Sequence, residues 1–121
     1  MEQLWIEPVG SDLIMARVRG VLTEALLEEC QHRVIQLVKD TERGLVLYDA
    51  LEMEAPSIQV TLSQRRLDKE LGKIQLRRAI VVPNTKLAYL ARLAFAEGDY
   101  RVFYNDIVAA IQWLMEKEVH K

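Results

Sequence analysis

Hydrophobic positions recur in two different periods along the chain, and these periods predict strands and helices in turn. Short apolar runs at 4–6 and 13–19 flank turn-forming residues at 8–12, which predicts a β-hairpin. From Thr23, a good N-cap residue, apolar side chains return every three or four positions with charged residues between them. The resulting stripe predicts an amphipathic helix before Gly44, formed by Leu26, Leu27, Cys30, Val34, Leu37 and Val38.

The same alternation continues to the end of the chain, and residues 50–57 are predicted to be a loop. In chain order, the further elements are a strand at 45–48, a helix at 57–72, a strand at 79–82, a helix at 86–96, a strand at 102–104 and a final helix from Asn105 through Met115. The predicted order is β-β-α-β-α-β-α-β-α. Strands that alternate with helices form a mostly parallel central sheet, so we expect an α/β fold with the hairpin as an antiparallel edge.

The predicted helices differ in character. Helix 57–72 has a narrow apolar stripe at Val60, Leu67 and Leu71, and it is expected to stop at Gly72. Helix 86–96 is apolar almost all round, which indicates that it is deeply buried or part of an interface. Residues that open or cap helices precede these two helices and the final helix. They are Pro56 with Ser57 for helix 57–72, Asn84 or Thr85 for helix 86–96, and Asn105 for the final helix.

Size and charge narrow the class of protein. A chain of 121 residues makes one domain, taken here as 1–121. Its net charge of -2 argues against a dedicated nucleic-acid binder, which carries a basic excess. The single cysteine, Cys30, suits a reducing compartment. The sequence predicts no signal peptide and no apolar run near the roughly 20 residues of a membrane span. We therefore expect a soluble cytoplasmic protein.

The residue types that carry catalysis or bind metals do not occur at productive spacings. His32, His120 and Cys30 show no spacing typical of zinc ligands, so no metal or other cofactor is predicted. Cys30 lies on the apolar stripe of the first helix, where packing is its expected role. No nucleophile elbow and no glycine-rich phosphate loop is present. The sequence predicts no catalytic residue and a protein that is not an enzyme.

Charged residues are unevenly placed and allow two interpretations. The carboxylates Asp49, Glu52 and Glu54 could perform acid–base chemistry if burial separated their pKa values, but a solvated acidic loop is the favoured interpretation. The segment 21–56 is rich in acids and 57–92 is rich in bases. The basic helix 57–72 could dock an acidic partner, although an ordinary solvated face is favoured.

One edge of the predicted sheet gathers polar residues. Ligands of open α/β sheets bind beyond the carboxyl ends of the strands. That edge would collect Asp49, Ala50, Ser57, Asn84, Thr85, Tyr104 and Asn105, several of which also read as simple helix caps. With the neighbouring charges, the candidate binding residues for a partner or ligand are Asp49, Glu52, Ser57, Arg65, Arg66, Asn84 and Asn105.

Several stretches together resemble the STAS superfamily, specifically its SpoIIAA-like (STAS/SEC14) branch of small stand-alone bacterial proteins. They are Gly20-Val21-Leu22-Thr23, the segment 44–49, Arg78-Ala79-Ile80-Val81-Val82, Leu90-Ala91-Arg92-Leu93-Ala94-Phe95, Tyr100-Arg101-Val102-Phe103 and Ala109-Ala110-Ile111-Gln112-Trp113-Leu114. The resemblance covers nearly the whole chain, mostly through core patterning.

The resemblance implies a sheet wrapped by helices, with no enzymatic activity and a regulatory or protein-binding role. Anti-sigma-factor antagonists of the superfamily bind a partner kinase and are switched by phosphorylation of a serine in an Asp-Ser-Ser-Gly motif. This chain has Ala55-Pro56-Ser57-Ile58 there, with Ser57 as the nearby hydroxyl, so that switch is not carried over. The SEC14-like side of the branch implies an alternative function, the binding of an apolar small molecule or lipid.

Surplus apolar residues bear on assembly. The large side chains Trp5, Tyr89, Leu93 and Trp113 exceed what one side of a thin sheet would bury. Excess apolar surface on a small domain commonly forms a two-fold interface. The sequence therefore predicts a homodimer in addition to a protein partner.

Overall fold

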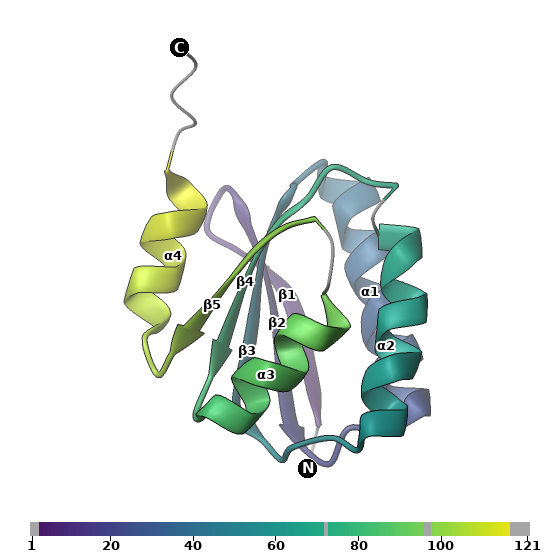
Figure 1. The fold of residues 1–121 in the computed structure, drawn as a ribbon. Coiled ribbons are helices and arrows are strands. Elements are labelled where there is room, and N and C mark those ends of the chain that lie inside the picture. Colours follow the sequence, from purple (N-terminus) through teal and green to yellow (C-terminus); the bar gives the residue numbers. More distant parts are fainter. Residues whose placement is uncertain (1–2, 72, 96–97, 117–121) are drawn as a thin grey trace.

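A computed structural model describes residues 3–71, 73–95 and 98–116, which form a five-stranded sheet in the order β1-β2-β3-β4-β5 (Figure 1). The strands are β1 (Leu4–Val9), β2 (Leu13–Gly20), β3 (Leu45–Met53), β4 (Arg77–Val82) and β5 (Asp99–Tyr104). β1 pairs antiparallel with β2, and every later pair is parallel. The predicted α/β class, element order and antiparallel edge are confirmed.

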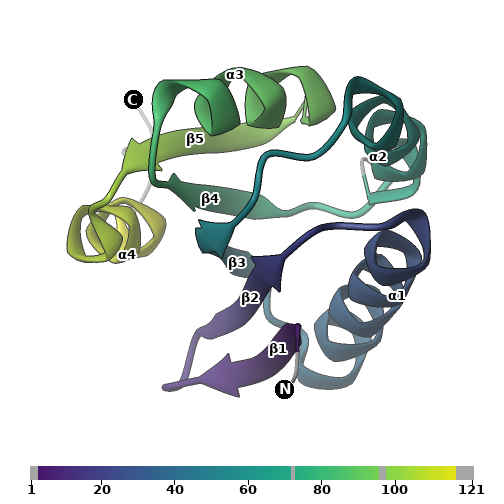
Figure 2. The ribbon, with the colours of Figure 1, turned by 90° about the horizontal axis from the view of Figure 1, so that it is seen from below.

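The helices are distributed unequally over the two sides of the sheet. They are α1 (Glu24–Thr41), α2 (Ile58–Leu71), α3 (Thr85–Ala94) and α4 (Ile107–Met115). Figure 2 shows α1, α2 and α3 on one side, which we call the three-helix face. Helix α4 lies on the other side, the single-helix face, where it contacts β3, β4 and β5.

The side chains of β3 show how one strand serves both faces. Val46 packs into the cluster under α1, whereas Leu47 packs into the cluster under α4. Tyr48 and Ala50 return to the three-helix face, as the two-residue period of a strand requires. Both faces of the central strands are therefore apolar, which explains the continuous hydrophobic runs in the sequence.

The structure corrects the extent of β3. The strand continues to Met53, whereas the sequence predicted its end at residue 48 and a loop at 50–57. It stays paired with β2 through a β-bulge, in which Arg17 lies opposite Asp49 and Arg19 lies opposite Glu52. The extra residue interrupts the regular alternation, and the acidic side chains of this segment concealed the strand.

Helix α2 lies further from the sheet than α1 and α3 do. Within the described residues, its Cα atoms come within 8 Å of α1 and α3 but of no strand. The apolar stripe predicted for it is only partly correct, because Leu71 is buried while Val60 and Leu67 are half-buried. Thr61, Ser63 and Asp68 are also buried. Gly72, which was predicted to end the helix, lies outside the described residues.

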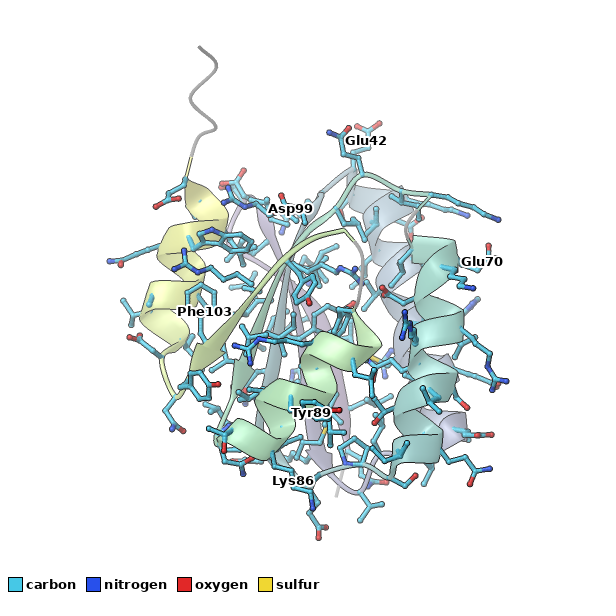
Figure 3. All side chains as sticks on the ribbon, viewed as in Figure 1. Glu42, Glu70, Lys86, Tyr89, Asp99 and Phe103 are labelled. Atoms are coloured by element: carbon cyan, nitrogen blue, oxygen red, sulfur yellow. The ribbon has the colours of Figure 1, made fainter. Side chains whose placement is uncertain are left out.

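Helix α3 is buried on one side and exposed on the other, so the burial predicted for it is confirmed for one side. Leu87, Ala88, Leu90 and Ala94 are buried against the sheet. Tyr89 points away from the helix into solvent and is 64% exposed (Figure 3). The described helix ends at Ala94, and residue 96 of its predicted range lies outside the described residues.

Candidate functional site

The outward side of α2 carries an exposed stripe in which apolar residues precede basic ones. Ile58 and Leu62 are 54% and 45% exposed, and the exposed Arg65 and Lys69 continue the stripe at helical spacing. Among the described residues, neither Arg65 nor Lys69 forms an ion pair. We call these four residues the α2 stripe. It combines exposed apolar surface with uncompensated positive charge.

Beside the stripe, the surface is hollowed between α2 and the first turn of α1. The hollow has a volume of about 460 Å³ and is lined by Glu24, Gln59, Leu62, Ser63, Arg65, Arg66 and Lys69. Ser63 Oγ donates to Glu24 Oε1 at 2.9 Å and accepts from Arg66 Nη2 at 3.0 Å. Arg66 therefore helps to hold α2 against α1, while Arg65 stays free for contact.

Ser57 caps α2, as the sequence predicted. Its hydroxyl accepts from the Val60 amide at 3.1 Å, and its carbonyl oxygen accepts from the Thr61 hydroxyl at 2.9 Å. Ser57 itself is exposed and lies at the carboxyl edge of the sheet. It directly precedes Ile58, so the cap adjoins the first residue of the α2 stripe.

Asp49 and Glu52 do not lie in an open acidic loop, and that expectation is wrong. Asp49 is 4% exposed in the middle of β3, where its carboxylate accepts from Arg17 Nε at 3.0 Å and from the Leu51 amide at 3.1 Å. Glu52 pairs with Arg19 of β2. Because strand side chains on one face recur every second residue, Arg17 and Arg19 share the single-helix face with Leu13 and Met15. The two ion pairs therefore lie across the sheet from the α2 stripe. They do not flank Ser57.

Asn84 and Asn105 lie at neighbouring loops but have different roles. Asn84 caps α3, since its Oδ1 accepts from the Leu87 amide at 2.9 Å. The predicted cap at Asn105 is wrong, because Asp106 Oδ1 accepts the Ala109 amide at 2.9 Å instead. Asn105 adopts a left-handed φ of 52°, which asparagine tolerates, and donates to the Pro83 carbonyl at 3.3 Å.

A buried ion pair connects α2 to the sheet, and the sequence pattern did not predict it. Arg78 and Asp68 are 3% and 9% exposed, and Arg78 Nη2 donates to Asp68 Oδ2 at 3.1 Å. The guanidinium also lies 4.6 Å from the ring centroid of Phe95. Burial disfavours the charge on Arg78, but hydrogen bonding to Asp68 and the neighbouring acids outweigh it and raise its pKa. In the sequence, the position of Asp68 between Leu67 and Leu71 of the predicted apolar stripe could have indicated that Asp68 is buried.

Two small apolar cavities lie between α2 and the sheet, with volumes of about 70 and 30 Å³. Both are lined by Leu27, Cys30, Tyr48, Gln64 and Phe95. Burial raises the pKa of Cys30 to about 12, and it also raises the pKa of Tyr48. Both side chains are therefore protonated at neutral pH. The predicted packing role of Cys30 is confirmed by its burial.

Two classes of feature are absent from residues 3–71, 73–95 and 98–116. No group of three or more histidine, cysteine, aspartate or glutamate side chains could hold a metal ion there. No helix in this part of the chain has the length and apolar character needed to cross a membrane. His32 is exposed on α1, and His120 lies outside the described residues.

Comparisons with known proteins identify the fold. No protein-family model matches the chain, and no curated protein matches it. It is similar to the crystal structure of an uncharacterised DUF3478-family protein with a SpoIIAA-like fold from Shewanella loihica PV-4, with a TM-score of 0.64 and 23% identity over 92% of this chain and 91% of the other. It is also similar to the anti-sigma factor antagonist SpoIIAA in its unphosphorylated form, with a TM-score of 0.61 and 12% identity over 92% and 96% of the two chains. The chain therefore has a SpoIIAA-like fold, which confirms the fold that the resemblance implied.

Proposed function

We propose that this chain is a non-enzymatic regulatory module that works by binding a protein partner, and that one domain spans residues 1–121. One observation carries the proposal: the α2 stripe offers Ile58 and Leu62 beside Arg65 and Lys69, two cations that form no ion pair within the part of the chain that the structure describes. The SpoIIAA-like fold supports it, because a structure with this fold is an anti-sigma factor antagonist. A cytoplasmic location is part of the same proposal.

The stripe sets the chemistry of the partner. Exposed aliphatic side chains favour an apolar contact, and unpaired basic side chains favour an acidic surface beside it. The partner should therefore present apolar residues next to aspartate or glutamate. Ser57 contributes as cap and contact residue at the start of the surface. Asp49 and Glu52, which the sequence also suggested as contact residues, are not part of the proposed partner-binding surface, since their ion pairs lie on the single-helix face.

A charge-reversal experiment tests the docking surface. Affinity-tagged protein is used to isolate native partners, and each captured partner is purified and its affinity measured. The double variant Arg65→Glu/Lys69→Glu should weaken binding of the functional partner about tenfold or more, a loss of about 1.4 kcal/mol. The affinity of the partner for the unchanged protein should also fall with added salt, because exposed charges are screened.

Helix α3 provides a matched control. Lys86 and Arg92 are exposed on α3 and, among the described residues, form no ion pair. Lys86→Glu/Arg92→Glu changes the net charge by the same amount at a different surface. If both double variants weaken binding equally, the effect is one of overall charge and the α2 stripe is not the docking surface.

A carrier of an apolar ligand or lipid is the other function class that the sequence leaves open. The relevant observation is the cavity of about 70 Å³ beneath α2. Pockets that enclose drug-sized ligands measure roughly 300–1,000 Å³. The space is too small for a lipid, so a lipid-carrier function is not part of the proposal.

We also propose that the chain forms a homodimer. Trp5 and Tyr89 are 48% and 64% exposed, on β1 and α3 respectively. Trp113 contributes less than expected, because it packs on Phe103 and under the Arg77 guanidinium. Light scattering at micromolar concentration should give twice the 14.0 kDa mass of one chain. A mass of one chain would contradict the proposal.

A further inference from the structure

Helix α4 is more apolar than its place on the surface requires. It contains no charged residue, and Gln112 is its only hydrophilic side chain. A helix that is apolar all round is normally buried on every side. In α4 only Ala110 and Leu114 are buried, while Val108 and Met115 are 66% and 45% exposed. Val108, Gln112 and Met115 recur at helical spacing on the outer side of α4, and we call them the α4 stripe.

The same face of the sheet has an uncovered part at β1. Within the described residues, the Cα atoms of α4 come within 8 Å of β3, β4 and β5 only, and α1, the helix that approaches β1, lies on the three-helix face (Figure 2). Leu4 and Ile6 belong to the core cluster under α1, so the alternating residues of β1 point to the single-helix face. These are Trp5 and Val9, which are 48% and 37% exposed, and the exposed Glu7 between them. We call these three residues the β1 stripe.

The two stripes match in length and in order. From Val108 to Met115 the helix rises about 10 Å, at 1.5 Å per residue. From Trp5 to Val9 the strand extends about 13 Å, at about 3.3 Å per residue. Each stripe places one polar residue between two apolar ones. The helix lacks a cover of the kind that the sheet can provide, and the sheet lacks a helix.

We propose that a second copy of this chain docks on the single-helix face, so that the α4 stripe of each copy packs on the β1 stripe of the other. A two-fold axis parallel to the strands, midway between two facing sheets, gives this arrangement because it places the two α4 helices side by side in one layer. A two-fold axis across the strands would press α4 against α4 and leave both β1 stripes uncovered. The inference rests on the proposed homodimer and is independent of the α2 stripe.

The direction of α4 sets the order of the contacts. Figure 1 shows α4 running back alongside β5, so α4 is antiparallel to the four parallel strands and runs in the same direction as β1. A two-fold axis parallel to the strands keeps this direction in the second copy. The residues that meet across the interface are then Val108 with Trp5, Gln112 with Glu7, and Met115 with Val9.

The polar groups at this interface are complementary. The Gln112 amide can donate to the Glu7 carboxylate between the two apolar pairs. Asp106, which is exposed at the start of α4, comes to the end of β2 that carries Arg17, whose side chain is 34% exposed. An acidic group thus meets a basic one at the margin of the interface, where such pairs set the orientation of the partners.

The symmetry also supplies area. A stable dimer buries about 800 Å² per partner, roughly a tenth of the 7347 Å² surface of one chain. Because the two-fold axis repeats the contact, each chain contributes both stripes and their surroundings to that area. A single contact between one helix and one strand would contribute half as much.

A mixing experiment tests which surfaces meet. Val108→Lys and Trp5→Glu should each weaken dimerisation about hundredfold or more, since each change acts at both symmetric contacts. An equimolar mixture of the two variants should regain the dimer. One contact then pairs the new lysine with the new glutamate, and the other keeps the original Val108 and Trp5. Light scattering at micromolar concentration measures the mass in each case.

Cross-linking tests the same geometry with smaller changes. Glu7→Cys and Gln112→Cys alter exposed positions, and the native Cys30 is buried. A short bis-maleimide should link the two cysteine variants when they are mixed and should link neither variant to itself. The cross-link decides the interface if a charged variant fails to fold, as circular dichroism would show.

Tyr89→Lys on α3 is the matched control, because Tyr89 is another large exposed side chain and is 64% exposed. This variant should remain a dimer. A dimer that is broken by Tyr89→Lys and kept by Val108→Lys would overturn the interface and leave the homodimer in place. So would folded charged variants that stay monomeric when mixed, together with cysteine variants that do not cross-link. An unchanged protein that is monomeric would overturn the homodimer itself.

Discussion

Each face of the sheet contains a carboxylate held by an arginine, and the two pairs differ in how they are covered. On the three-helix face, the Arg78 and Asp68 side chains are only 4% and 10% exposed. On the single-helix face, Asp49 is equally buried, but its partner Arg17 is 34% exposed. Within the described residues, the Cα atoms of α4 come within 8 Å of β3, β4 and β5 but not of β1 or β2, so α4 is centred away from Arg17. Arg17 is left in partial contact with water.

From this difference in exposure we expect burial, more than ion-pair geometry, to set how much each pair contributes to stability. Two fully buried charges lose their hydration and depend on one another, so the removal of one leaves the other uncompensated. Arg17 retains part of its hydration, and Asp49 also accepts a backbone hydrogen bond from the Leu51 amide at 3.1 Å. The first pair should therefore be the more sensitive to change.

The largest expected effect is the loss of Arg78. Arg78→Met should lower the free energy of unfolding by about 3–5 kcal/mol, since Asp68 would remain buried without its partner. Arg17→Met should cost about 1–2 kcal/mol, because water can reach the vacated site and the Leu51 hydrogen bond remains. Urea denaturation followed by tryptophan fluorescence measures both losses.

The double variant Asp68→Leu/Arg78→Met separates charge burial from packing. It removes both charges at once, so it should recover most of the stability lost in Arg78→Met alone. If Arg78→Met and Arg17→Met cost the same, the contrast between the two faces is wrong. If the double variant is no more stable than Arg78→Met, the pair acts mainly through its packing with Phe95.

A second prediction uses the protonation of the three-helix face. An unfolded cysteine loses its proton near pH 9.0, whereas burial keeps Cys30 protonated in the folded protein up to about pH 12. Between these values the unfolded chain binds fewer protons, so stability falls as pH rises. The slope from Cys30 should be about 1 kcal/mol per pH unit, and burial of the Tyr48 hydroxyl adds to it at the higher pH values.

The comparison of slopes between pH 9 and 10 isolates Cys30. Cys30→Ala should flatten the fall in the free energy of unfolding over this range, whatever it does to stability at neutral pH. A control substitution at the exposed His32 of α1 should leave the slope unchanged. An equally steep fall in Cys30→Ala would mean that the thiol is not the group responsible.

The order of strands and helices was predictable because each buried strand is a continuous apolar run and each helix begins near a capping residue. Ser57 and Asn84 act as caps through contacts three residues away, a range that sequence patterns capture. Asp49 and Asp68 were not recognised as buried, because their partners lie 32 and 10 residues away and only the fold brings them together. A charged residue considered alone predicts solvent exposure.

The cap of the final helix was missed for a local reason. Asn105 and Asp106 are adjacent, and both residue types cap helices. The left-handed φ of 52° at Asn105 turns the chain and leaves Asp106 in the capping position. Backbone conformation, which the side-chain pattern does not specify, made the choice. The cavity beneath α2 could not be predicted from the sequence either, since it depends on how α2 packs over its neighbouring elements.

The smallest predicted effect compares caps on the two faces. Ser57→Ala removes the cap of α2, and Asp106→Ala removes the cap of α4, so each should cost about 1 kcal/mol. Asp106→Ala should cost slightly more, because a carboxylate also interacts favourably with the positive end of the helix dipole. Urea denaturation measures both, and Ser57→Asn should restore the lost stability. Because α2 is held to the sheet mainly at Asp68, the loss of Ser57 should loosen only its first turn, seen as faster hydrogen exchange there. A loss near 3 kcal/mol for Ser57→Ala would mean that the start of α2 supports the three-helix face as strongly as the Asp68–Arg78 pair does.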